Sequence, residues 1–206
     1  MAQYGDRARE SLLDAAEELF ALHGIDAVSN RKITEHAGTA NHSAIKYHFG
    51  GRDDMIAALL ARGRDEVAAR RAAIVDMLPD EPSLHDTIGA GVLPWVGYLE
   101  SLPVPSWHAR FYYQAMSLPS AEDSMRETIE NSVLFDPGIT RVPELADVPE
   151  SVLVPRIRIL AGLTLRLCAG YEADLEAGTA EGDWTSIGYF IVDAATGMLA
   201  APVTRR

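Results

Sequence analysis

Apolar residues recur at helical spacing along almost the whole chain, and this periodicity limits the possible folds more than any other feature of the sequence. In residues 7–23, charged side chains separate the apolar ones, which are Leu12, Ala15, Ala16, Leu19, Phe20 and Leu22. Such spacing places the apolar side chains on one face of a helix. No alternation typical of a strand lasts for more than a few residues. The sequence therefore predicts an all-α fold.

Glycine and proline mark the ends of the expected helices. Gly24 and Gly38 suit the left-handed conformation that ends a helix. Pro94 is expected to kink or split its helix, and four prolines between 136 and 155 predict a rigid, irregular connector. The expected helices are residues 7–23, about 29–38, about 41–48, a long one at about 53–77, and then about 84–101, 106–117, 120–134, 152–177 and 184–200.

Composition excludes several classes of protein. Among the 206 residues 48% are hydrophobic, which is enough for a sizeable core in one domain or two small ones. No run of 18 apolar residues exists and acidic residues interrupt the N-terminus, so we expect no membrane helix and no signal peptide. The single cysteine, Cys168, excludes an internal disulfide, and a cytoplasmic location fits. Nucleophile-elbow, P-loop and dinucleotide motifs are absent, so we expect no enzyme, no catalytic residue and no cofactor.

The charge of the chain is distributed unevenly. The net charge is -12, yet the only two lysines, Lys32 and Lys46, lie within residues 29–54. Residues 29–52 contain four basic residues and one acidic residue, Glu35. This pattern favours a local basic surface that could meet a polyanion. On charge alone, an ordinary solvated helix face is an open alternative.

A short helix, a tight turn at Gly38 and another short helix are the parts of a helix-turn-helix. The second of these helices would project a set of polar side chains from one face, namely Asn41, His42, Ser43, Lys46 and Tyr47. Side chains of these types form hydrogen bonds with base edges or phosphates in a major groove. The sequence therefore predicts a DNA-reading element near the N-terminus.

Three segments carry a family resemblance: "LLDAAEELFALHG", "RKITEHAG" and "IKYHFGGRDDMIAALL". With them, residues 7–62 resemble the N-terminal domain of the TetR/AcrR family of bacterial transcriptional regulators. The resemblance implies a helix-turn-helix DNA-binding domain at 1–52 and a helical effector-binding and dimerisation domain at 53–206. It also implies that the homodimer binds a palindromic operator and that an unknown small-molecule effector relieves repression. Beyond residue 62 the likeness is one of helical character and length only.

The resemblance assigns DNA-contacting roles to Asn30, Arg31, Asn41, His42, Ser43, Lys46, Tyr47 and Arg52. Arg52 opens the fourth helix, where the family usually places a lysine on a phosphate. The sequence departs from the family pattern in two places. Lys46 stands where a tyrosine is usual, and the ten steps from Gly38 to His48 are one more than expected. The alternative is therefore a helical ligand-binding or protein-interaction module whose helix-turn-helix no longer reads DNA specifically.

The aromatic stretch "WHARFYYQAM" predicts a ligand pocket in the second domain. With two aromatic residues from the preceding helix, the predicted pocket residues are Trp95, Tyr98, Trp107, His108, Arg110, Phe111, Tyr112 and Met116. Apolar walls with a few polar groups are typical of small-molecule sites. For any single residue of this set, burial in the core is the alternative.

The last two predicted helices are apolar on more than one face, which favours burial on two sides. A larger single core is one interpretation. The resemblance implies a two-fold four-helix interface instead, and the predicted interface residues are Ile159, Leu163, Leu167, Ile191, Ala195 and Met198. His36, His42 and His48 recur every six residues, but that spacing turns them to different helix faces, so we expect no metal site.

Overall fold

The computed structural model of the chain describes residues 2–39, 41, 43–116, 118 and 142–204. Within these ranges the chain forms helices and no strands, which confirms the predicted all-α fold. The predicted helix at 120–134 lies outside the described residues. The helices are α1 (Ala2–His23), α2 (Asn30–His36), α3 (Ala44–Phe49), α4 (Arg52–Leu60), α5 (Arg64–Val75), α6 (Leu84–Ser101), α7 (His108–Ala115), the short 3-10 helix η4 (Pro143–Leu145), α9 (Glu150–Ala177) and α10 (Trp184–Ala200).

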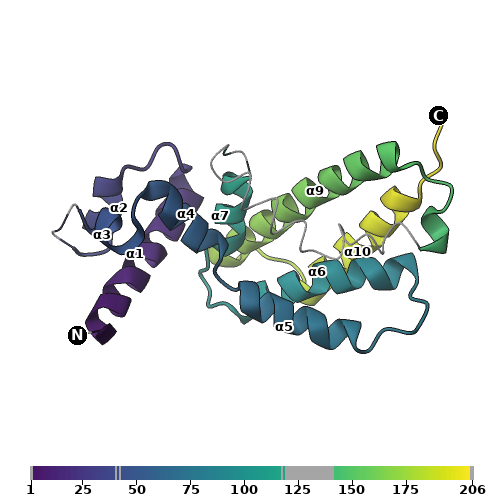
Figure 1. Ribbon diagram of the computed structural model, residues 1–206, viewed down its shortest axis with the longest axis horizontal. Coiled ribbons are helices and arrows are strands. Elements are labelled where there is room, and N and C mark those ends of the chain that lie inside the picture. The colour runs from purple at the N-terminus through teal and green to yellow at the C-terminus, as the bar shows by residue number, and fades with distance from the viewer. Residues whose placement is uncertain (1, 40, 42, 117, 119–141, 205–206) are drawn as a thin grey trace.

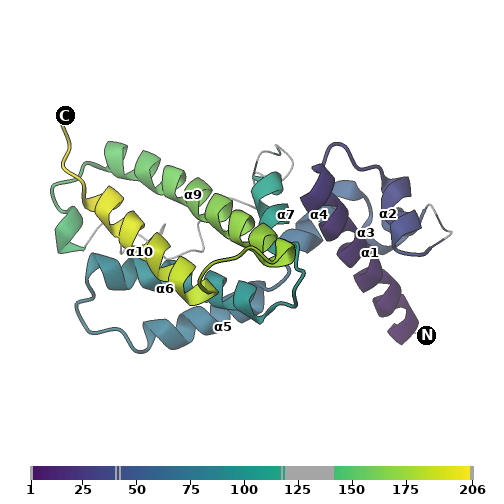
Figure 2. The ribbon, with the colours of Figure 1, turned by 180° about the vertical axis from the view of Figure 1, so that it is seen from behind.

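The helices form two lobes along one long axis (Figure 1). Helices α1 to α4 make the N-terminal lobe, and α5, α6, α9 and α10 make the larger C-terminal lobe. The view from behind shows α7 between them (Figure 2), where it packs on α1 and on α9. Among the described residues, no helix is long and apolar enough to cross a membrane.

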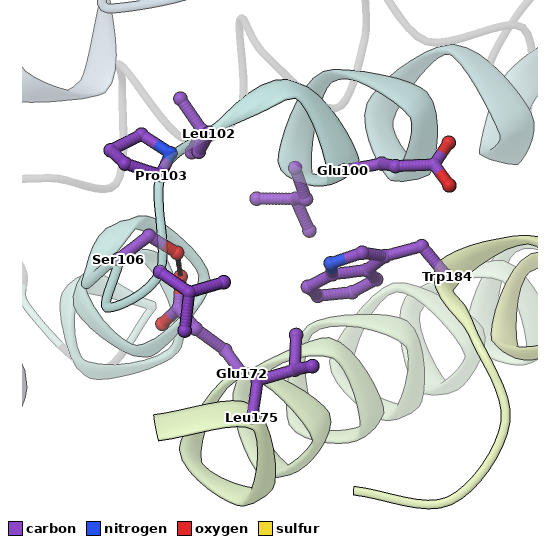
Figure 3. A pocket seen from close by; sticks show the side chains of 9 residues that line it. Glu100, Leu102, Pro103, Ser106, Glu172, Leu175 and Trp184 are labelled. Atoms are coloured by element: carbon purple, nitrogen blue, oxygen red, sulfur yellow. Dashed lines mark hydrogen bonds between the residues drawn. The ribbon is translucent and has the colours of Figure 1, made fainter. Parts of the chain in front are cut away.

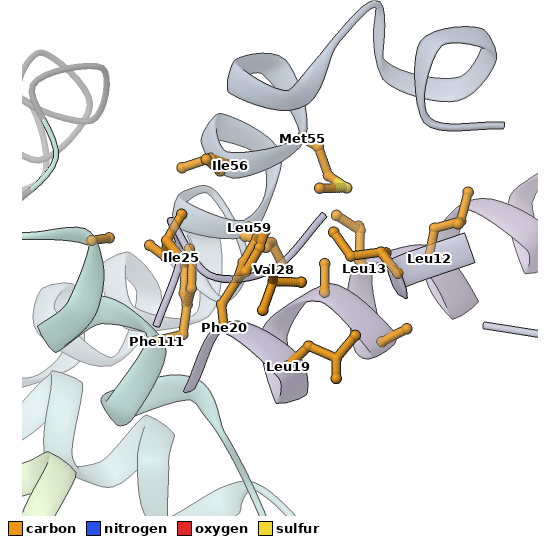
Figure 4. Close-up of a cluster of buried hydrophobic side chains, with 14 of the residues drawn as sticks. Leu12, Leu13, Leu19, Phe20, Ile25, Val28, Met55, Ile56, Leu59 and Phe111 are labelled. Carbon is orange, nitrogen blue, oxygen red and sulfur yellow. The ribbon is translucent and has the colours of Figure 1, made fainter. Parts of the chain in front are cut away.

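The N-terminal lobe is held by a core drawn from α1 to α4 and from the loop after α1, part of which Figure 4 shows. Leu12, Leu13 and Phe20 of α1 meet Met55 and Leu59 of α4, and all five side chains are buried. Fully burying each such side chain stabilises the fold by about 1.5–3 kcal/mol. The core continues into α7, so apolar packing connects the N-terminal lobe to the junction between the lobes.

The predicted long helix over 53–77 is wrong in one respect, because the chain breaks it into α4 and α5. Gly63 between them has φ +71, a left-handed conformation that ends a helical path. The ring of Tyr98 packs so tightly here that a Cβ atom on Gly63 would lie 2.2 Å from its Cζ atom. The packing of Tyr98 against this turn therefore depends on the glycine. The local pattern of apolar residues does not predict this contact.

Helix α6, where Pro94 predicted a kink or a split, is not split. The helix runs without interruption from Leu84 to Ser101. Ser83 and Asp86 form a reciprocal capping box at its start. A proline removes only one backbone donor, and the packing of α6 along α10 in the C-terminal core keeps the helix continuous.

Candidate nucleic-acid interface and regulatory sites

Helices α2 and α3 form the predicted helix-turn-helix. The Ser29 side chain caps α2 by accepting a 3.2 Å hydrogen bond from the Lys32 backbone N–H. Gly38, with φ +70, makes the turn. The Asn41 carboxamide then accepts a 3.0 Å hydrogen bond from the Ser43 backbone N–H just before α3 begins. Local hydrogen bonds thus orient the two helices while Ile33 and Ile45 anchor them in the core.

The outer face of α3 is available to a partner. Ala44 and Ile45 are buried, whereas Lys46 and Tyr47 are exposed. Tyr47 is 81% exposed, the largest value among the exposed large hydrophobic side chains in the described ranges. No hydrogen bond or ion pair within the described chain engages the Lys46 side chain. An ammonium and a phenol side by side on one helix suit a phosphate and a groove edge. His42 lies outside the described residues.

Asn30 and Arg31, which were predicted to contact DNA at the start of α2, have different surroundings. The Arg31 side chain is exposed, and its Nε donates a 2.7 Å hydrogen bond to Glu35, which raises the pKa of the guanidinium. An exposed pair of this kind contributes little to stability and can be exchanged for a phosphate. Lys32, which the prediction left out, is exposed beside Arg31. The position of Lys32 within the basic stretch of the sequence could have indicated its role.

The Arg52 guanidinium is engaged by other residues of the N-terminal lobe. Its guanidinium donates to Asn30 Oδ1 at 2.9 Å and to the Ile25 carbonyl at 2.6 Å, and it stacks over the Phe20 ring at 4.8 Å. Burial lowers the pKa of this arginine. Arg52 and Asn30, both predicted to contact DNA, therefore bind each other. The arrangement makes Arg52 a residue that positions the start of α2.

An ionic network joins the two lobes. Arg62, directly after α4, donates to Glu10 at 2.8 Å, Asp14 at 2.7 Å and Glu17 at 2.9 Å, all on α1. The other oxygen of Glu17 lies 2.5 Å from His108 Nδ1 at the start of α7. Burial acts to raise the pKa of Glu17, but His108 and Arg62 together lower it below its ordinary value. Glu17 is therefore a buried carboxylate shared by an arginine and a histidine.

Four of the predicted pocket residues form one aromatic cluster at this junction: Trp95, Tyr98, His108 and Tyr112. The ring of His108 lies 4.9–5.4 Å from the other three ring centroids. The Tyr112 hydroxyl donates to the Leu60 carbonyl at the end of α4, and burial raises the pKa of this tyrosine. Trp95 lies beside the buried Cys168 thiol, and within the described chain His108 Nε2 is buried without a hydrogen-bond partner. Unpaired buried polar atoms of this kind are uncommon and indicate a missing partner.

The other predicted pocket residues have different surroundings, although the Phe111 ring packs edge-on against Tyr112. Phe111 is fully buried in the N-terminal core. Arg110 stacks over Trp107 at 4.5 Å and donates to Glu172 at 3.2 Å and Glu176 at 2.7 Å, so it ties α7 to α9. Met116 is partly exposed and faces Gly162 of α9. The sequence pattern predicted that all eight side chains lie in one region. It could not distinguish the side chains that pack in the core from those that link helices or line a cavity.

A cleft of about 450 Å³ opens where the lobes meet. Its walls come from α1, the turn between α4 and α5, the end of α6 and the loop into α7. The lining residues are Asp14, Glu17, Glu18, Arg62, Gly63, Tyr98, Leu102, Pro103, Pro105, Ser106, Trp107 and His108. Asp14, Glu17 and Glu18, which supply the acidic wall, were not among the predicted site residues.

A smaller cavity of about 100 Å³ shares Leu102, Pro103 and Ser106 with the cleft (Figure 3). Glu172 lies in its wall, and its carboxylate accepts from Ser106 Oγ at 2.7 Å and from the backbone N–H groups of Ala109 and Arg110. This buried carboxylate is thus fully paired. It anchors the first turn of α7 and leaves no oxygen for a ligand.

The predicted dimer residues fall into two groups. Ile159, Leu163 and Leu167 are 56%, 50% and 38% exposed and follow one another at four-residue spacing on α9. Ile191 and Ala195 are buried in the C-terminal core, and Met198 packs against it. These three residues of α10 therefore serve the protomer's own core. The neighbouring Tyr189 and Phe190, which the prediction omitted, are the exposed apolar residues of α10.

From the sequence, His36, His42 and His48 were expected to form no metal site. His36 Nε2 lies 2.9 Å from Glu18, and His48 packs edge-on against Tyr47. In the described ranges, no three histidine, cysteine, aspartate or glutamate side chains gather as metal ligands would.

The fold contains a helix-turn-helix whose second helix, α3, has an exposed outer face. Residues 12–59 match the family described as bacterial regulatory proteins, tetR family. The N-terminal part of the chain therefore matches the TetR family, as its sequence predicted. No curated protein matches the sequence.

Solved structures of similar shape are also regulators. A TetR-like transcriptional regulator from Rhodococcus sp. RHA1 has 14% identity and a TM-score of 0.58, with 95% of this chain and 97% of that chain covered. A second transcriptional regulator from Rhodococcus sp. Rha1 has 21% identity and a TM-score of 0.52, with 93% and 95% covered. RolR in complex with the ligand resorcinol has 15% identity and a TM-score of 0.48, with 100% and 99% covered. The Rhodococcus structures show that the fold is shared over 93–95% of this chain.

Proposed function

We propose that the protein is a ligand-relieved transcriptional repressor that binds a palindromic DNA operator as a homodimer. The observation that carries the proposal is the face of α3, where Lys46 and Tyr47 are exposed and the residues behind them are buried. Asn41 and Ser43 at the leading end of α3, with His42 between them, would read base edges. Arg31 and Lys32 on α2 would meet phosphates, while Asn30 would be held by Arg52.

The dimer would form through the apolar stripe of α9 and α10, which consists of Ile159, Leu163, Leu167, Tyr189 and Phe190. Large exposed apolar side chains on two adjacent helices are typical of a surface that a partner covers. A two-fold dimer presents two copies of α3 to successive major grooves, and this matches a palindromic operator.

Repression would be relieved by a small molecule that binds near the junction of the lobes. The network of Glu17, Arg62 and His108 connects α1 with α7 and with the turn after α4. A ligand that favours another arrangement of these contacts would change the spacing of the two α3 helices. To act as a switch, it must bind the two arrangements with affinities that differ by about 1–3 kcal/mol.

Selection from a random pool of duplex DNA tests the DNA-reading part. Purified protein at low salt is expected to enrich a palindrome whose half-sites are centred about one helical turn apart or slightly more. The enriched duplex then serves as the probe for ligand release. A folded dimer that enriches no sequence would contradict the proposal.

One observation favours a second candidate function, a helical ligand-binding or interaction module without specific DNA reading. Arg52 is engaged inside the protein, and Lys46 replaces the tyrosine usual in the family. A gel shift with random-sequence DNA at low salt separates the two functions. A DNA-binding regulator retains weak, salt-sensitive binding there, whereas the second candidate shows none.

A further inference from the structure

The small cavity beside the cleft has walls that are mainly apolar. It lies between the end of α6, the loop before α7, the end of α9 and the start of α10, and its volume is about 100 Å³ (Figure 3). The apolar lining residues are Leu99, Leu102, Pro103, Val104 and Leu175. Val104 is 62% exposed, so the loop borders the cavity on the solvent side. Since a cavity of about 150 Å³ holds benzene, this one has room for roughly four to six non-hydrogen atoms.

The indole of Trp184 brings a hydrogen-bond donor to this cavity. The side chain is only 7% exposed, and among the described residues no hydrogen bond engages its Nε1–H. Figure 3 shows the indole reaching from α10 into the space between Leu102 and Leu175, with the ring nitrogen on its inner edge. Buried indole N–H groups usually have a partner. The cavity wall therefore contains an unpaired donor.

The surrounding contacts fix the direction of this donor. The Asp183 carboxylate caps α10 by accepting a 2.7 Å hydrogen bond from the Ser186 backbone N–H. The Trp184 ring packs edge-on against Tyr171, with 4.8 Å between the ring centroids. The Tyr171 hydroxyl in turn donates to the Gly182 carbonyl at 3.0 Å. A donor that is already held in place costs little ordering entropy when a ligand binds.

The other polar groups of the lining offer little to a charged or strongly polar ligand. The Glu172 carboxylate is fully paired with Ser106 and the first turn of α7. The Ser106 hydroxyl has given its hydrogen to Glu172, so its oxygen can only accept. The Glu100 carboxylate points away from the cavity (Figure 3). A water would thus find two side-chain partners, Trp184 and Ser106, where buried waters make about three hydrogen bonds.

We propose that this cavity binds a small uncharged molecule that carries a carbonyl oxygen, such as a short or cyclic ketone. The oxygen accepts from Trp184 Nε1, and the carbon skeleton packs on the leucines of the wall. A protonated amine has no lone pair for the indole, and a carboxylate would be buried beside Glu172. This binding does not depend on DNA reading and goes beyond the proposed function.

Two probes of the same size and different charge test the ligand class, cyclopentanone and protonated cyclopentylamine. Binding is measured by the indole N–H signals of the ¹⁵N-labelled full-length protein, which has three tryptophans. The signal of Trp184 is the one that disappears in Trp184→Phe. Cyclopentanone is expected to shift this signal saturably, with a Kd on the order of 1 mM for so small a ligand. The amine is expected to leave the signal unchanged.

Matched variants locate the site, with binding followed on the ketone by saturation-transfer NMR. Trp184→Phe keeps a ring against Tyr171 but removes the donor, and the ketone should bind about fivefold more weakly. Trp107→Phe removes an indole outside the cavity lining and should bind like the parent. Leu175→Phe keeps the donor but fills the cavity, so binding should be lost. Circular dichroism of each variant confirms that it is folded.

Each outcome decides the proposal. A shift of the Trp184 signal by the ketone alone, with weaker binding in Trp184→Phe and none in Leu175→Phe, supports it. The proposal is overturned if the folded parent shows no saturable shift, because the cavity then holds water only. An equal shift by the amine, equal binding by the two tryptophan variants, or undiminished binding by Leu175→Phe also overturns it. Since no DNA is present, failure of the proposed function would leave the binding result intact.

Discussion

The two lobes bury similar apolar cores but leave opposite kinds of surface uncovered. In the N-terminal lobe the outer face of α2 and α3 is polar and basic, with Tyr47 as its exposed aromatic residue. In the C-terminal lobe α9 and α10 expose a stripe of aliphatic and aromatic side chains. In the proposed function the two surfaces have different partners, a polyanion for the first and a second copy of the chain for the other.

The lobes also differ in how they are joined. Inside each lobe the contacts are largely apolar, whereas the junction adds the buried ion pair of Glu17 and Arg62, with His108 hydrogen-bonded to Glu17. Apolar packing is non-directional and tolerant, but a buried charge without its partner is strongly unfavourable. The junction is thus the part of the molecule where a small change in ligand or protonation has the largest effect.

The largest expected effect is at the junction, from Gly63→Ala. A side chain there meets both an unfavourable left-handed conformation and the Tyr98 ring, so unfolding free energy should fall by about 3 kcal/mol. Gly178→Ala is the matched control, because Gly178 has nearly the same φ and open space around it. The control should lose about 1 kcal/mol in urea unfolding. Equal losses would show that Tyr98 does not tie the lobes at this turn.

A smaller effect is expected from Glu17→Gln, which removes the charge shared by Arg62 and His108. Unfolding free energy at pH 7 should fall by about 2–3 kcal/mol, because a buried ion pair loses one partner. Glu18→Gln, next to it and paired only with the exposed His36, should change stability by less than about 0.5 kcal/mol.

The pH dependence of the same pair of variants sharpens this test. The folded-state pKa of Glu17 lies below its unfolded value, so its contribution is complete above an unfolded pKa of about 4.3. It is lost as the pH falls through the folded pKa. The stabilities of the parent and Glu17→Gln should therefore converge in acid. A constant difference down to acid unfolding would contradict the assigned ionised state.

The contrast between the two surfaces predicts the next effect. Phe190→Glu places a charge in the apolar stripe and should weaken the dimer about a hundredfold, measured by sedimentation against concentration. Met77→Glu makes the same change at an exposed apolar residue just after α5, outside the stripe. If both variants dissociate, or if neither does, the proposal that a second copy of the chain covers the stripe is contradicted.

The smallest effect distinguishes two basic residues of the N-terminal lobe. Lys46→Gln should reduce the slope of log affinity against log salt by about 0.9, because one phosphate contact is lost. Arg52→Gln should lower operator affinity through the misplacement of Asn30 but leave that slope unchanged. If Arg52→Gln also reduces the slope, Arg52 meets phosphate directly in the complex.

Much of the fold could be predicted because helical periodicity and turn residues are local. The all-α class, the bounds of α2, α6 and α10 within a few residues, and the helix-turn-helix around Gly38 all depend on neighbours in the sequence. The family resemblance depended on the same local patterns. In the C-terminal lobe, periodicity also indicated apolar faces on α9 and α10 but not their rotation. Ile191 therefore lies in the core while the adjacent Phe190 faces outward.

By itself, the sequence determined that this is a helical protein with a helix-turn-helix at one end. Only the tertiary structure decided that Arg52 binds Asn30, that Tyr98 meets Gly63, and that α1 supplies the acidic wall of a cleft. Partners of these kinds lie tens of residues apart. Their contacts depend on the rotation of each helix about its axis and on the approach of the two lobes, and local spacing does not specify either quantity.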